Sequence, residues 1–301
     1  MNMARRISSR AFLDRLNTLR HQRPDFNTLI FLAGEDVWLE WGHSVGVTVD
    51  ETLRSLVDPL PPLKLKHIAG PSSDSLYLAS GLRDAAKVVD IYEAHAGAPT
   101  TPISVLDFGC GAGRMMRFIS KMPNYRLTGC DVNGDLAKWC AQNLVGIDTV
   151  LSGMTPPLPF ADGDFDMVYS KSVFSHLPES SFCAWIAELA RVVKPGGWIA
   201  LTTNGVASLD TLIALKDRQA AWQVSESTAK DLKARFDSIQ FWHTRLPPEI
   251  AGPAKVELDY GHTFVHGSYL ERIGKHVGLT VVKVHSGYMT GKQDLVMLAR
   301  H

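Results

Sequence analysis

The residues best suited to chemistry lie in the segment 105–114, which reads V-L-D-F-G-C-G-A-G-R. A short apolar run leads to Asp107, and three glycines follow at alternate positions, Gly109, Gly111 and Gly113. A stretch compatible with a helix comes next. Because a strand, a glycine turn and a helix in this order let a backbone approach a nucleotide-like ligand closely, the segment predicts a binding site for such a ligand.

The glycine pattern differs from the dinucleotide-binding pattern G-x-G-x-x-G, because Arg114 stands where the third glycine of that pattern would fall. Asp107 would also place a carboxylate beside a pyrophosphate, which is unfavourable. S-adenosylmethionine suits this carboxylate better, since it carries an ammonium and a sulfonium group. Asp131 lies 22 residues after Gly109, at the end of an expected second strand, where an acid can accept hydrogen bonds from ribose hydroxyls.

Apolar runs and helical periodicity alternate along the chain. Strands are expected over residues 103–106, 125–130, 147–151, 164–170, 198–203, 279–285 and 294–299. Helices are expected over residues 73–96, with a candidate break near Gly81, and over 179–193, 208–235 and 268–276. A Lys-Pro-Gly-Gly turn precedes the fifth strand. Strands that alternate with helices predict a parallel sheet with helices on both faces.

Four blocks of sequence together resemble the class I S-adenosylmethionine-dependent methyltransferases. They are 105–114, G-C-D at 129–131, P-L-P-F-A-D-G-D-F-D-M-V-Y-S at 157–170 and R-V-V-K-P-G-G-W at 191–198. The resemblance covers residues 100–203 and, by pattern, the C-terminal end. It implies an α/β, Rossmann-like, doubly wound and mostly parallel seven-stranded sheet with an antiparallel C-terminal edge strand. The segment S-V-F-S-H-L-P-E at 172–179 is also similar to a bacterial branch of glycosyltransferase-associated methyltransferases.

The resemblance implies S-adenosylmethionine as the cofactor and a set of residues that bind it. Asp107 would hold the amino-acid end of the cofactor and Asp131 the ribose hydroxyls. The family often has an acid two residues after the third strand, where this chain has Met154, so adenine recognition would fall to backbone groups, Thr155 or apolar packing. The predicted cofactor-binding residues are Asp107, Gly109, Cys110, Gly111, Gly113, Asp131, Val132, Met154, Thr155 and Ser170.

Methyl transfer needs an acceptor atom aligned opposite sulfur, a site that excludes water and often one base. His176, which follows the fourth strand, is the first candidate base by position, and a histidine that merely binds backbone is the alternative. His262 and His266 are candidate lid histidines facing the substrate. On a helix their spacing could bind a metal, but Gly261 and Gly267 argue against a helix, so no metal is predicted.

Composition limits the class of protein. The chain has 301 residues, 45% of them hydrophobic, and a formal net charge of zero, which argues against a broad nucleic-acid-binding surface. Its four cysteines form no C-x-x-C pair and fit a reducing compartment. No apolar run approaches the length of about 18 residues typical of a membrane span. A cytoplasmic protein without a membrane span or a nucleic-acid partner is therefore expected.

Four regions are expected: a helical N-terminal leader over 1–98, the cofactor-binding core over 99–203, a helical insertion or lid over 204–266, and a helix and hairpin over 267–301 that complete the core sheet. The leading hypothesis is an enzyme that transfers a methyl group to a small-molecule acceptor, such as a saccharide or a glycolipid precursor, by in-line displacement. The alternatives are a protein or nucleic-acid methyltransferase and a non-catalytic cofactor-binding subunit. The sequence leaves the oligomeric state open.

Overall fold

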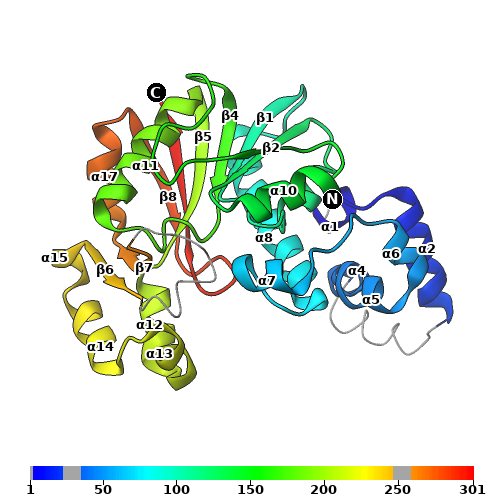
Figure 1. Ribbon diagram of the computed structural model, residues 1–301, viewed down its shortest axis with the longest axis horizontal. Helices are drawn as coiled ribbons and strands as arrows, with labels where there is room; N and C mark the ends of the chain where they lie inside the picture. Colours follow the sequence, from blue (N-terminus) through cyan, green and yellow to red (C-terminus); the bar gives the residue numbers. More distant parts are fainter. Residues whose placement is uncertain (1–2, 23–34, 247–258) are drawn as a thin grey trace.

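The computed structural model describes residues 3–22, 35–246 and 259–301 (Figure 1). Its core is a seven-stranded sheet of order β3-β2-β1-β4-β5-β9-β8, in which β1 to β5 run parallel and β9 is antiparallel to both β5 and β8. The strands are β1 Ile103–Phe108, β2 Tyr125–Asp131, β3 Asp148–Leu151, β4 Phe165–Ser170, β5 Val193–Thr203, β8 Leu279–His285 and β9 Asp294–Arg300. This arrangement confirms the expected fold class.

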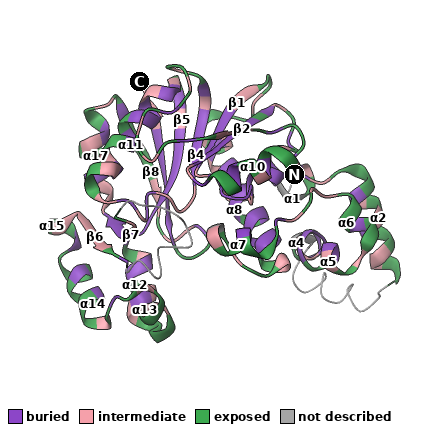
Figure 2. Cartoon of the chain, in the orientation of Figure 1, coloured by how far each residue is buried: buried purple, intermediate pink, exposed green. Residues whose placement is uncertain are grey.

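The two faces of the sheet are covered by different helices. Val105 and Met167 share a hydrophobic core with α8 (Asp74–Ala96) and α9 (Met116–Ile119), whereas Leu106 and Val168 share one with α11 (Glu179–Val192) and α17 (Gly267–Lys275). Successive residues of a strand therefore enter opposite cores, which explains why the central strands are apolar throughout. Figure 2 shows these strands as the most continuously buried part of the molecule.

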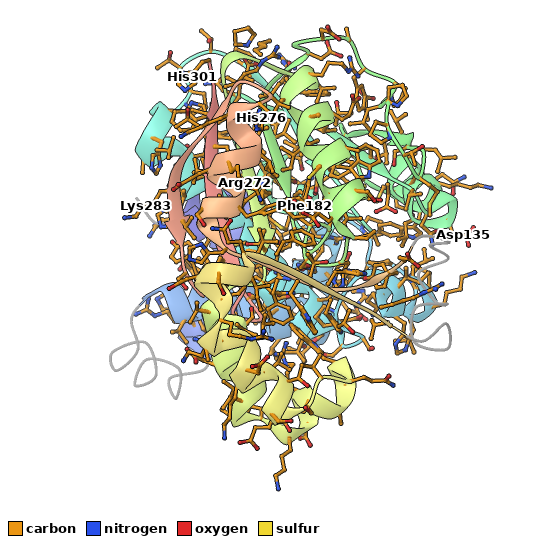
Figure 3. All side chains as sticks on the ribbon, turned by 90° about the vertical axis from the view of Figure 1, so that its left-hand side faces the viewer. Asp135, Phe182, Arg272, His276, Lys283 and His301 are labelled. Atoms are coloured by element: carbon orange, nitrogen blue, oxygen red, sulfur yellow. The ribbon has the colours of Figure 1, made fainter. Side chains whose placement is uncertain are left out.

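Helix α11 shows how amphipathic spacing positions a covering helix. Phe182 is fully buried between α11 and the sheet (Figure 3). On the neighbouring helix α17, Arg272 and His276 are exposed.

Strand β5 begins at Val193 rather than at Trp198, because the Lys-Pro-Gly-Gly segment forms an irregular first part of the strand instead of a separate turn.

The N-terminal leader contains a series of short helices before α8. They are α1 Met3–Arg6, α2 Arg10–Gln22, α4 Glu35–Trp41, the π-helical turn η1 Gly42–Gly46, α5 Val47–Val49, α6 Glu51–Ser55 and α7 Leu63–Ala69. Phe12 and Leu16 of α2 are buried in the same core as α8, so the leader packs on the sheet domain. Within the described ranges, none of the helices is long and apolar enough to span a bilayer.

The expected break near Gly81 is wrong, since α8 continues from Asp74 to Ala96. A Cβ at Gly81 would lie 2.3 Å from the carbonyl oxygen of Arg114. Glycine therefore serves close packing of α8 on the glycine segment after β1, and it does not end the helix.

The insertion is helical over most of residues 208–235, as expected, but the helical region is divided into short helices. It consists of α12 Val206–Ala214, α13 Lys216–Trp222, α14 Glu226–Ala234 and α15 Phe236–Ile239. Gln223, with φ of +52°, ends α13, and the side chain of Ser225 caps α14. A second sheet of β6 (Phe241–Arg245) and β7 (Gly261–Val265) was not predicted, because 15 residues separate its strands and no tight-turn signal joins them.

Between α9 and α11, α10 (Gly134–Asn143) packs on the outer strands β2 and β3. The strand order reverses between β1 and β4, and ligands of open α/β sheets bind in the crevice at the carboxyl ends of such strands. Figure 1 places the leader and the insertion on either side of this end of the sheet.

Candidate functional site

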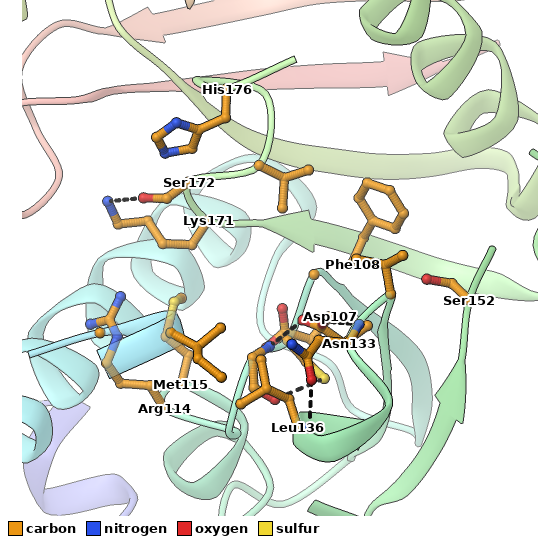
Figure 4. A pocket seen from close by; sticks show the side chains of 18 of the residues that line it. Asp107, Phe108, Arg114, Met115, Asn133, Leu136, Ser152, Lys171, Ser172 and His176 are labelled. Atoms are coloured by element: carbon orange, nitrogen blue, oxygen red, sulfur yellow. Dashed lines mark hydrogen bonds between the residues drawn. The ribbon is translucent and has the colours of Figure 1, made fainter. Parts of the chain in front are cut away.

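A cavity of about 450 Å³ opens at the carboxyl ends of β1, β2 and β4. The glycine segment after β1 lines one side, and the segment 171–177 after β4 lines the opposite side (Figure 4). Tyr260 and the pair Thr290–Gly291 complete the wall from the C-terminal part of the chain. The cavity is therefore assembled from the sheet, the N-terminal segment around α7 and α8, the insertion and the loop between β8 and β9.

The glycine segment is held against β2 by its backbone. The amides of Gly109 and Cys110 both donate to the carbonyl oxygen of Cys130, at 2.9 and 3.0 Å. Gly109 has φ of +76°, and a Cβ there would lie 2.2 Å from Cγ2 of Val173 on the opposite wall. Only glycine fits this position, because any side chain would be strained and would close the cavity.

Asp131 ends β2 and is held by two backbone amides. Gly111 donates to its Oδ2 and Asn133 to its Oδ1, both at 2.8 Å. Burial raises the pKa of Asp131, whereas these two hydrogen bonds favour its ionised form. Each oxygen keeps acceptor capacity, so the fixed carboxylate can accept hydrogen bonds from two neighbouring hydroxyls such as those of a ribose.

Asp107 is the penultimate residue of β1, lies beside Asp131 and is 3% exposed. Burial raises its pKa to about 7, and the Asp131 carboxylate adds to this effect. Among the described residues, no lysine or arginine forms an ion pair with it. A cation supplied by a ligand would favour the carboxylate, so this position fits an ammonium group.

Two cations and a third acid lie on the neighbouring part of the wall. Arg114 donates through Nη1 to Asp84 and to Ser80, both at 3.1 Å. Lys171 donates to the carbonyl oxygen of Thr290 at 3.1 Å and to Gln293, and burial lowers its pKa to about 8. Figure 4 shows both cations on the same side of the pocket.

The charges of the described lining residues do not cancel. The acids Asp84, Asp107 and Asp131 stand against the bases Arg114 and Lys171, so the ionised wall carries one net negative charge. A buried site of this kind is best balanced by a ligand with one net positive charge. S-adenosylmethionine, with one carboxylate, one ammonium and one sulfonium group, carries that charge.

His176 lines the cavity on the side opposite the two carboxylates. Its Nδ1 lies 2.7 Å from the carbonyl oxygen of Gly261, which can only accept, so Nδ1 carries the proton and Nε2 is the acceptor. The ring stacks on Tyr260 with centroids 4.6 Å apart. Burial lowers the pKa of His176 to about 4, so the imidazole is neutral at pH 7.

The structure brings most of the predicted site residues together. Those that line the cavity are Asp107, Gly109, Cys110, Gly111, Asp131, Val132, Met154 and His176. Gly113, Thr155 and Ser170 do not line it. Ser170 instead donates to the carbonyl oxygen of Phe108 at 2.9 Å, which joins the ends of β1 and β4, and Gly113 faces Leu144 after α10.

The two other candidate histidines lie outside the cavity lining. His262 is in strand β7, stacked on Trp222 with centroids 4.3 Å apart and 5.6 Å from the ring of His176. His266 caps α17, where its Nδ1 contacts the Ser268 hydroxyl at 2.7 Å. Within the described part of the chain, no three His, Cys, Asp or Glu side chains are arranged to hold a metal.

Several lining residues carried no usable signal in the sequence. Asp84 lies in the middle of α8, and Trp185 in α11 has the spacing of an ordinary core residue. Thr290 lies more than a hundred residues from the glycine segment. Arg114 could have been found, because it directly follows the last glycine of that segment.

Comparisons with known proteins agree with this geometry. Residues 105–197 match the family described as a methyltransferase domain. A 2-methyl-6-phytyl-1,4-hydroquinone methyltransferase from Synechocystis is 33% identical over 116 residues, which cover 34% of this chain and 32% of that protein. A malonyl-[acyl-carrier protein] O-methyltransferase from Erwinia pyrifoliae is 32% identical over 194 residues, covering 64% of this chain and 68% of that protein.

Among solved structures, the chain is similar to a SAM-dependent methyltransferase from Aquifex aeolicus, with a TM-score of 0.47 and 19% identity, over 80% of this chain and 98% of that one. Among the sequence relatives, the match to the Synechocystis protein spans about a third of that protein's length, and the match to the Erwinia protein spans more than two thirds. The match to the Erwinia relative and the methyltransferase-domain match over residues 105–197 together place the chain in the class I S-adenosylmethionine-dependent methyltransferases, whose cofactor is S-adenosylmethionine.

Proposed function

We propose that this chain transfers the methyl group of S-adenosylmethionine to a hydroxyl group of a small, uncharged acceptor, with His176 as the general base. The observation that carries the proposal is the orientation of this histidine. Its Nδ1–H is held by Gly261, so the neutral Nε2 is the acceptor nitrogen of a residue that lines the cavity. A neutral base that can accept one proton suits an acceptor that must lose one.

The cofactor, when bound, supplies an activated methyl group on a sulfonium sulfur. Asp107 pairs with the ammonium of its amino-acid end, because this buried carboxyl lacks a cation of its own among the described residues. Asp131 accepts hydrogen bonds from the ribose hydroxyls through the capacity that Gly111 and Asn133 leave free. Val132 and Met154 border the adenine, and no acidic side chain at position 154 contributes to its recognition.

Methyl transfer to a neutral hydroxyl group balances in protons and in electrons. The acceptor oxygen forms the new bond to the methyl carbon, and the electron pair of the carbon–sulfur bond passes to sulfur. Nε2 of His176 takes the hydroxyl proton. The side chains near His176 exclude water from this step, since Leu177 is buried and Tyr260 stacks on the imidazole.

The charge of the cavity supports an uncharged acceptor. One net negative charge on the described wall balances the one net positive charge of the cofactor. An acceptor that carried its own charge would be buried without a counter-charge, which is costly. Saccharide and quinol hydroxyls both meet this requirement. The likeness of segment 172–179 to glycosyltransferase-associated enzymes favours a saccharide, and a quinol is the type of acceptor in the name of the Synechocystis relative.

The test is a transfer assay with radiolabelled S-adenosylmethionine and three groups of acceptors: neutral saccharides, quinols and carboxylates of similar size. We expect labelled product from a hydroxyl acceptor and none from carboxylates. His176→Gln should lower kcat by about 10²-fold or more and leave the affinity for S-adenosylhomocysteine unchanged. His266→Asn is the matched control, because this histidine lies outside the cavity and asparagine can still cap α17. Full activity of His176→Gln, or transfer to carboxylates alone, would overturn the proposal.

A further inference from the structure

A second cavity, of about 260 Å³, lies between the leader and α9. It shares no lining residue with the cavity described above. Its lining includes the apolar residues Ile7, Phe12 and Phe118 and the polar residues Arg117 and His43. A hollow of this size accommodates a small organic molecule.

Arg117 is a buried cation that forms no ion pair with an acid of the described ranges. It is 3% exposed, and its Nη1 and Nη2 donate to the carbonyl oxygens of Asp58 and Pro59, at 3.3 and 3.1 Å. Its Nε is buried and has no hydrogen-bond partner in the described structure. The nearby carboxylate of Asp58 is already paired with Lys121 at 2.9 Å. Because buried arginines are normally paired, this side chain is incomplete without a further group.

His43 also lines this cavity and presents a second incomplete group. It is 4% exposed and belongs to the π-helical turn η1, a type of turn that is frequent at functional sites. Its Nε2 lies 2.6 Å from the hydroxyl of Ser8, and its Nδ1 has no partner within the described ranges. When Ser8 donates to Nε2, Nδ1 carries a proton that it can donate. The imidazole stacks on Phe12, with centroids 4.1 Å apart.

We propose that this second cavity binds a small organic carboxylate with an apolar body. The carboxylate accepts hydrogen bonds from Nε of Arg117 and Nδ1 of His43, and the apolar body contacts Phe12 and Phe118. The charges agree with this class of ligand, since Arg117 and Lys121 stand against one acid, Asp58, and leave one net positive charge on the described wall. The proposal is independent of methyl transfer, because the two cavities share no lining residue.

The test is calorimetric titration of the full chain with benzoate, after the first cavity has been saturated with S-adenosylhomocysteine. Benzamide, which has the same shape without the charge, is the matched probe. We expect benzamide to bind at least about tenfold more weakly than benzoate, and Arg117→Met to weaken benzoate by a similar factor. Arg235→Met, which removes an exposed arginine of α14, should leave benzoate binding unchanged. Equal affinity for the two probes, or no benzoate binding, would overturn the proposal.

A second measurement does not depend on any variant. Wild-type crystals soaked with 4-bromobenzoate should show an anomalous bromine peak beside Phe12 and Phe118, with the carboxylate at Arg117 and His43. Bromine found only in the first cavity or on the surface would contradict the assignment. This result decides the question even if Arg117→Met does not fold, because Arg117 also lies over the ring of Tyr77 and supports its packing.

Discussion

Lowering the pH from 7.5 to 5.5 should weaken the binding of S-adenosylhomocysteine by about 25-fold, because Asp107 must be ionised to pair with the ligand's ammonium group. Burial raises the pKa of this carboxyl to about 7 in the free protein. An ammonium in contact favours the carboxylate, so protons and the ligand compete for Asp107. Affinity is therefore full above the raised pKa and falls as the pH drops below it.

The magnitude follows from the fraction of ionised Asp107. With a pKa of about 7, roughly three quarters of the free protein carries the carboxylate at pH 7.5 and about 3% at pH 5.5. The ratio of these fractions is about 25, which corresponds to about 1.9 kcal/mol of binding free energy. The ligand's own amino group, with an ordinary pKa of about 7.7 to 8.0, is mostly protonated over this range, and its further protonation at pH 5.5 offsets the loss by less than a factor of two.

Isothermal titration calorimetry at the two pH values provides the measurement, with two controls. The first is 5′-methylthioadenosine, which retains the ribose and adenine and lacks the amino-acid end, so any pH dependence that it shows belongs to Asp131 or other groups. The second is Asp107→Asn, which should bind S-adenosylhomocysteine more weakly at pH 7.5 and with little pH dependence. A slope that persists in Asp107→Asn, or a flat profile in the wild type, would refute the pairing.

Three further predictions concern the same cavity. Asp131→Ala should weaken 5′-methylthioadenosine and S-adenosylhomocysteine alike, by about tenfold or more, since both contain the ribose; calorimetry that shows unchanged affinity for either would contradict the ribose assignment. Gly109→Ala should lower the melting temperature and cofactor affinity, and Val173→Ala should restore part of both, because the added Cβ meets Val173 at 2.2 Å; a double variant no better than the single one would show that backbone strain at φ +76° dominates. The pKa of His176, followed by NMR, should be higher with S-adenosylhomocysteine bound than with S-adenosylmethionine, because the sulfonium charge is absent; equal values would separate His176 from the methyl-transfer step.

The cofactor side of the cavity could be predicted because it is local in sequence. Asp107, Gly109, Gly111 and Asp131 lie within 25 residues, at or just after the ends of two adjacent parallel strands, and the register of those strands fixes which residues meet there. Strand register does not determine the direction in which a side chain points at the end of a strand. Ser170 also ends a central strand, yet its hydroxyl bonds to the carbonyl oxygen of Phe108 and does not line the cavity.

The opposite side could be predicted only in part, because its geometry depends on segments far apart in the chain. His176 was identified from its position after β4, but its orientation comes from Gly261, 85 residues later. Gly261 belongs to β7, whose pairing with β6 spans a long connection that sequence periodicity does not reveal. The amide of Thr263 also donates to the carbonyl oxygen of Ser175 at 2.9 Å, so β7 fixes the whole segment after β4.

A base whose pKa is about 4 in the free protein would be too weak if its surroundings stayed the same during the reaction. They do not stay the same. Before transfer, the sulfonium charge balances the net negative wall formed by Asp84, Asp107 and Asp131 against two cations. After transfer sulfur is neutral, and the wall would be left with an uncompensated negative charge. The proton on His176 then replaces the lost positive charge within the same cavity, so the reaction itself raises the basicity of this histidine when the proton must be taken.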